Sequence, residues 1–127
     1  MKSILLLSAL MLACHLSFAE DGIKTAAQQK QQCEFYVSSQ KVPQADICFA
    51  YARGLKDAMD GDLSWLDDAH RNIGVGSWAE GVTVDQLVRV FVKFANENPA
   101  LLNQSAFNVF RQSAEIAGLY TFSSPGK

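Results

Sequence analysis

The stretch that decides the fold is PQADICFAYARGLKDAMD, residues 43–60. Apolar residues recur in it at the helical period, at Ile47, Tyr51, Leu55 and Ala58, and with Cys48, Ala52 and Met59 beside them they form one broad apolar stripe. Pro43 suits the first turn, where its missing N–H has no partner in any case. Gly61 suits a cap beyond the last turn. Gly54, in the middle, indicates that another element packs closely against the helix backbone. We therefore expect a buried central helix here.

The first nineteen residues have the pattern of a secretory signal rather than of a folded element. Lys2 supplies a short positive region, residues 4–13 are apolar, and Ser17-Phe18-Ala19 forms a small-x-small cleavage site. The apolar run is too short to span a membrane. We expect cleavage after Ala19, a periplasmic location and no membrane anchor on the product.

Size and charge narrow the possible functions of the remaining chain. Residues 20–127 are enough for one domain with a single hydrophobic core. The full sequence has 11 basic and 13 acidic residues, a formal net charge of −2. A weakly acidic chain without a Lys/Arg cluster argues against binding to nucleic acid or to an anionic membrane surface.

Three cysteines are present. Cys14 lies within the expected signal; in a minor alternative it is a lipidated cysteine, with Met11 in place of the usual leucine three residues before it. Cys33 and Cys48 remain as an even pair in an oxidising compartment, which favours a disulfide between adjacent helices. A closed loop of about 15 residues is worth roughly 3 kcal/mol in the chain-entropy model. The alternative is two buried thiols.

Three further helices are expected. Residues 24–38 carry glutamines first and apolar side chains later. Residues 84–97 follow a capping-box pair, Thr83 and Gln86, and are apolar on most sides. Residues 105–117 precede Gly118, a suitable C-cap. No stretch alternates as a strand would. The expected fold class is all-α: a small bundle of four main helices, with a long loop between the second and third, stapled by one disulfide.

The long connection, DLSWLDDAHRNIGVGSWAEG (residues 62–81), has no convincing period. Long irregular loops often carry function, and tryptophan is enriched at interface hot spots. A tryptophan flanked by glycines is suited to project from the surface; the alternative is that both tryptophans of this loop cap the core. The candidate partner-binding residues are Trp65, Asp67, Asp68, His70, Trp78 and Glu80.

Motifs for catalysis or metal binding are not found. His70 is the only histidine after the expected signal, which excludes a two-histidine zinc site. An EF-hand aligned on Gly61 places Lys56 and Ala58 at the first and third ligand positions, so the calcium interpretation fails. Ser77 is not in a nucleophile elbow, because the first required glycine is missing. We expect neither an enzyme nor a bound cofactor.

Three segments in order resemble a known family. They are Cys48-Phe49-Ala50-Tyr51-Ala52-Arg53-Gly54, Gly81-Val82-Thr83-Val84-Asp85-Gln86-Leu87, and Asn98-Pro99 after an apolar helix. The pattern C-x-x-Y-x-x-G, V-T-x-x-Q-L and x-P resembles the Rap/Tai immunity family, small exported α-helical proteins linked to type VI secretion. The resemblance covers about residues 46–117. Many members place a cysteine just before the V-T motif, with a proline after it, where this chain has Ser77-Trp78-Ala79. Cys33 is then the only partner left for Cys48.

The resemblance implies a periplasmic protector that binds and blocks a toxic effector delivered by sibling cells, often a peptidoglycan amidase. It also implies a homodimer, and in the amidase-directed members a loop that enters the effector's active-site cleft. The apolar character of residues 84–95 independently favours a dimer. The alternative function is a periplasmic chaperone or stress-response binding protein, a role in which small disulfide-stapled helical domains also serve.

Overall fold

The computed structural model describes residues 24–62 and 75–123 of the chain. In order, its elements are α2 (Ala26–Val37), α3 (Pro43–Ala58), β1 (Gly61–Asp62), β2 (Val75–Trp78), α4 (Val84–Glu97), the 3-10 helix η3 (Pro99–Leu101), α5 (Ala106–Ile116) and β3 (Tyr120–Ser123). The mostly helical bundle agrees with the expected fold class. The expected signal, residues 1–19, lies outside the described residues.

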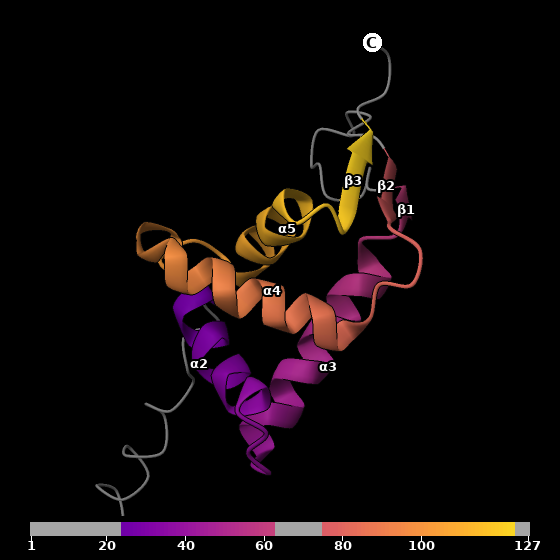
Figure 1. Ribbon diagram of the computed structural model, residues 1–127. Helices are drawn as coiled ribbons and strands as arrows, with labels where there is room; N and C mark the ends of the chain where they lie inside the picture. The colour runs from indigo at the N-terminus through magenta and orange to yellow at the C-terminus, as the bar shows by residue number, and fades with distance from the viewer. Residues whose placement is uncertain (1–23, 63–74, 124–127) are drawn as a thin grey trace, which may run out of the picture.

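Four α-helices of the described chain form the body of the fold. Figure 1 shows α2 and α3 meeting at the turn that joins them and diverging from it, with α4 lying across the pair. Helix α5 packs against α4 and α2, and the strands gather beyond the C-terminal end of α3.

Local capping explains where most of these helices begin. Three start after a hydroxyl side chain that accepts a backbone N–H three residues on: Thr25 from Gln28 at 3.3 Å, Thr83 from Gln86 at 3.1 Å and Ser105 from Asn108 at 3.3 Å. The cap expected at Thr83 is therefore confirmed. Helix α5 ends at its C-cap Ala117, and Gly118 follows with a φ of 71°. Helix α3 has Pro43 in its first turn and no side-chain cap.

The predicted disulfide between Cys33 and Cys48 is present. It joins α2 to α3 with a Cα–Cα distance of 5.0 Å, and both residues are fully buried. The Gln29 side-chain amide, also fully buried, donates to the Cys33 sulfur at 3.4 Å. The disulfide therefore lies inside the core, in the α2–α3 hairpin for which it was predicted.

The buried face of α3 is the side of the expected stripe that holds Cys48, Ala52 and Met59, not the side that holds Ile47. Ile47 is 46% exposed, whereas Ala45, Cys48 and Ala52 are buried. The helix is rotated so that Cys48 faces Cys33, and this moves the inner face by about one residue. The close contact expected at Gly54 is also not seen: among residues 24–62 and 75–123, a Cβ there would meet nothing within 4 Å.

Helix α4 has the central position, because it packs against α2, α3 and α5. Its buried residues are Leu87, Val88, Phe91, Val92 and Ala95. The Phe91 ring stacks on Phe110 of α5 with centroids 3.8 Å apart. The expectation that this helix is apolar on most sides was wrong, since Gln86, Arg89 and Lys93 form an exposed polar face.

A short antiparallel sheet, which the sequence did not predict, closes one end of the bundle. Strand β2 lies between β1 and β3, with Gly76 opposite Gly61 on one side and Phe122 on the other. Strands of two to four residues are too short to display an alternating pattern, and β3 comes from the other end of the chain.

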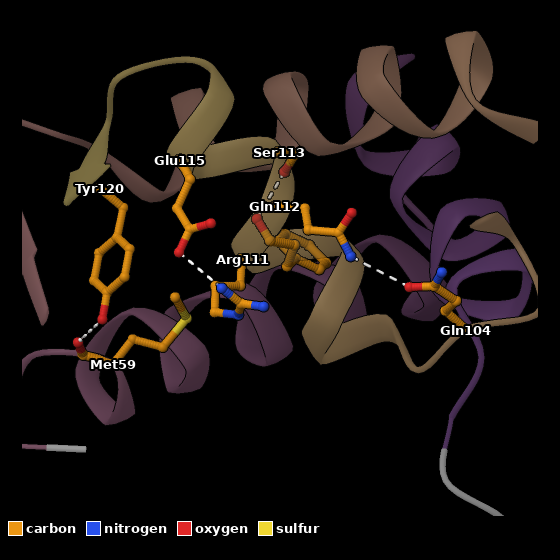
Figure 2. Close-up of polar contacts among 8 residues, drawn as sticks. Met59, Gln104, Arg111, Gln112, Ser113, Glu115 and Tyr120 are labelled. Atoms are coloured by element: carbon orange, nitrogen blue, oxygen red, sulfur yellow. Dashed lines mark hydrogen bonds and ion pairs between the residues drawn. The ribbon is translucent and has the colours of Figure 1, made fainter. Parts of the chain in front are cut away.

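Tyr120 joins this sheet to the helices. Figure 2 shows its side chain reaching from β3 to the end of α3, where the hydroxyl donates to the Met59 carbonyl oxygen at 2.8 Å. The ring leaves no room for a side chain on β2: a Cβ at Gly76 would overlap the Tyr120 hydroxyl and lie 2.7 Å from the Met59 oxygen. Gly76 is therefore needed for close approach rather than for an unusual backbone angle.

Candidate functional site

The six predicted partner-binding residues divide into two groups. Trp65, Asp67, Asp68 and His70 lie outside the described residues. Of the other two, Glu80 is exposed in the turn after β2, whereas Trp78 lies in β2 and is half-buried.

Trp78 does not project from the surface as its glycine-rich context indicated. Its ring packs against Tyr120 with centroids 4.7 Å apart, and its indole N–H donates to the Lys56 carbonyl oxygen at 2.9 Å. The Lys56 ammonium also lies over the ring, 5.8 Å from its centroid. The geometry supports the alternative interpretation, in which this tryptophan caps the core at the junction of α3 and the sheet.

Four residues of the family-like pattern occupy framework positions, whereas Gly54 and Gln86 are exposed. Cys48 is in the disulfide, Tyr51 packs against Phe110 at 5.8 Å between ring centroids, and Thr83 caps α4. Pro99 begins η3. These residues fix helix contacts and helix ends, so surface recognition must come from other side chains.

A groove lies where α2, α3 and α4 meet. About 640 Å³ in volume, it is lined by Tyr36 of α2, residues 39–43 of the turn, Ala45 and Asp46 of α3, and Asp85 and Arg89 of α4. Ser39 in this turn has a φ of 58°, unusual for a residue other than glycine. Sites for ligands and peptides are commonly concave regions of this size.

A network of hydrogen bonds joins three of the side chains that line this groove. The Tyr36 hydroxyl donates to Asp85 Oδ1 at 3.2 Å, and Arg89 Nε donates to Asp85 Oδ2 at 3.0 Å. The Asp85 carboxylate thus accepts on both oxygens and holds a tyrosine from one helix beside an arginine from another. None of these three residues was among the site residues predicted from the sequence, although the four-residue spacing of Asp85 and Arg89 on an expected helix is typical of an ion pair.

The charge state of the network is set by its own members. The hydrogen bond from Arg89 holds the pKa of Asp85 below its usual range, and partial burial raises the pKa of the Tyr36 hydroxyl. At neutral pH the network therefore contains a neutral tyrosine, an aspartate anion and an arginine cation. Because the pKa of Asp85 is lowered, the pairing is fully present above the unfolded-state value and is lost only as the pH falls through the folded-state value.

A second, apolar groove of about 220 Å³ lies between α4 and α5. It is lined by Val90, Phe94, Ile116 and Ala117, with Ser113 at its base and Lys93 and Glu97 on α4 beside it. Ile116 is 73% exposed, a large value for an isoleucine at the end of an ordered helix. Apolar side chains gathered in an exposed groove are typical of a surface that contacts another protein.

Chemical groups for metal binding are sparse in the described structure. Within residues 24–62 and 75–123, no cluster of three His, Cys, Asp or Glu side chains is arranged to hold a metal ion. The same ranges contain no helix of sufficient length and hydropathy to cross a membrane.

Comparisons with protein-family models, with curated proteins and with solved structures found no match to this chain.

The environment of Trp78 predicts a structural role that stability measurements can test. We expect Trp78→Ala to lower the free energy of unfolding by about 2 kcal/mol, less than a fully buried tryptophan because the ring is half-exposed. For a domain of this size that corresponds to a fall in Tm of about 10 °C. Trp78→Phe is the matched control. It keeps a ring against Tyr120 and loses only the hydrogen bond to the Lys56 carbonyl oxygen, so the free energy of unfolding should fall by about 1 kcal/mol. An unchanged Tm for Trp78→Ala would contradict the packed geometry.

Proposed function

We propose that this protein is an exported immunity protein that binds and neutralises a toxic effector delivered by type VI secretion, an enzyme of the peptidoglycan amidase class. The observation that carries the proposal is the placement of the family-like residues at the structural joints of the domain. Cys48 staples α2 to α3, Thr83 starts α4 and Pro99 starts the turn that follows it. If this chain has the framework of the family that it resembles, the residues of the pattern are expected at these joints between helices.

Two further features support the proposal. A disulfide is compatible with the oxidising periplasm, where an effector that attacks the cell wall must be met. The described surface also contains grooves and exposed apolar side chains, and these suit binding to a partner better than chemistry on a substrate. The segment around residues 65–80 remains the proposed effector contact, with the exposed Glu80 at its described end.

The proposal predicts protection that depends on export. The product of the adjacent open reading frame, sent to the periplasm of a laboratory bacterium, should lyse the cells. Co-expression of the full chain should prevent lysis. A variant lacking residues 1–19 is the matched control, and it should fail to protect because it remains in the cytoplasm. Lysis that continues in the presence of the exported chain, or a neighbouring product that is not toxic, would contradict the proposal.

The second candidate function, a periplasmic chaperone, is favoured by one observation: the exposed Ile116 in an apolar groove. A chaperone would suppress the aggregation of an unrelated unfolded protein at equimolar ratio. An immunity protein would leave that aggregation unchanged while still preventing lysis, so the two assays separate the functions.

We also propose a homodimer formed through the groove between α4 and α5. Lys93 and Glu97 are one turn apart on α4 and carry opposite charges. Two copies of α4 packed antiparallel across a two-fold axis would set the Lys93 of each opposite the Glu97 of the other, with Val90, Phe94 and Ile116 between them. Apolar burial and two charge pairs would then act in the same interface.

Light scattering on residues 20–127 at micromolar concentration should therefore give twice the chain mass. Ile116→Glu should yield a monomer, because it places a charge in the apolar centre of the interface. Ile47→Glu, at an exposed isoleucine on α3, is the control and should remain dimeric. A monomeric unsubstituted protein would refute the dimer.

A further inference from the structure

We propose that the groove between the α2–α3 turn and the first half of α4 is a second binding site, one that takes a peptide segment bearing a single carboxylate next to an aromatic side chain. The Arg89 guanidinium would receive the carboxylate, and the Tyr36 and Phe49 rings would receive the aromatic neighbour. The residues that line this groove come from α2, the α2–α3 turn, α3 and α4, and the proposed binding does not depend on the effector contact proposed for the segment around residues 65–80.

Arg89 is oriented before any ligand arrives. Its Nε is bonded to Asp85 Oδ2 at 3.0 Å, and the other oxygen of that carboxylate is held by Tyr36 from α2. Within the described residues the hydrogen bond to Asp85 engages only Nε, so the Nη groups remain available as donors. The arginine side chain is 51% exposed, and it lines the groove. A planar guanidinium fixed at one edge presents its other edge for a bidentate bond to a carboxylate.

The surroundings limit the ligand to one acidic group. Lys41 of the turn adds a second cation to the groove, whereas Asp46 of α3 adds an anion. A run of several acidic residues would be repelled by Asp46, while a single carboxylate can reach Arg89 and leave its neighbours elsewhere. Recognition of the ligand carboxylate therefore depends less on the net charge of the groove than on the directed N–H donors of Arg89.

An aromatic surface borders the same groove. The ring of Tyr36 stacks on Phe49 of α3, with centroids 5.6 Å apart. Phe49 is 36% exposed, which is unusual for a phenylalanine in the middle of a helix that contributes to a core. Because the two rings cover each other on one face, the surface that they leave for an aromatic side chain is the exposed part of Phe49 next to Tyr36, and Tyr36 lines the groove beside Arg89. With a volume of about 640 Å³, the open groove is suited to a few residues of extended peptide.

The inference can be tested by titrating ¹⁵N-labelled residues 20–127 with short peptides and following the amide signals of Tyr36, Lys41 and Arg89. The probes are acetyl-Ala-Phe-Glu-Ala-amide, its glutamine analogue, and the glutamine peptide with a free terminal carboxylate. The glutamate peptide should bind with a Kd of about 1 mM, and the amidated glutamine peptide about tenfold more weakly. If the free-terminus peptide binds as well as the glutamate peptide, or better, a chain terminus is the natural source of the carboxylate.

Substitutions test whether the Arg89 guanidinium is the group that binds the carboxylate. Arg89→Gln should weaken binding of the glutamate peptide about tenfold and abolish its advantage over the glutamine analogue. Arg89→Lys keeps the charge but lacks the fork, so it should lose most of that advantage. Arg53→Gln, the same change at an exposed arginine of α3 outside the groove, should leave affinity unchanged. Equal binding of the glutamate and amidated glutamine peptides to the unsubstituted protein would overturn the proposal. So would absence of binding at about 10 mM peptide, or equal losses for Arg89→Gln and Arg53→Gln.

Discussion

The disulfide between Cys33 and Cys48 is the constraint on which the rest of the structure depends. It fixes α2 against α3 at a Cα–Cα distance of 5.0 Å and a separation of 15 residues. Because both cysteines are fully buried, the bond also fixes how each helix is rotated about its axis. Helix α4 then lies across the pair and buries Phe91 against Phe110, while the turn between α2 and α3 forms one wall of the polar groove. The core and the polar groove therefore both depend on this disulfide.

A second constraint closes the opposite end of the fold. Tyr120 bonds to the last turn of α3, its ring packs against Trp78, and the absence of a side chain on Gly76 permits both contacts. The sheet is small, yet it ties the C-terminal strand to the end of α3. Aromatic contacts of this kind explain why a tryptophan in a glycine-rich segment contributes to the core rather than to the surface.

Sequence predicted the parts of this fold that are set locally. The start of α4 at Thr83 follows from residue spacing, and the disulfide follows from the even pair of cysteines that remains after the expected signal. The apolar stripe of α3 was predicted only in part, because Ile47 and Cys48 are adjacent and only the partner helix decides which of them is buried. The strands were missed because their pairing joins distant residues. The groove was missed for the same reason. The pairing of Asp85 with Arg89 can be predicted from their spacing on one helix, whereas the contact of Asp85 with Tyr36 joins residues 49 positions apart.

The central claim, that the buried staple holds the bundle together, is tested most directly by urea unfolding. Oxidised residues 20–127 would be compared with the Cys33→Ala/Cys48→Ala double variant. The account predicts a loss of about 3 kcal/mol in the free energy of unfolding, the value expected from closing a loop of this length. A loss below about 1 kcal/mol would contradict it, because the bundle would then be stable without the bond.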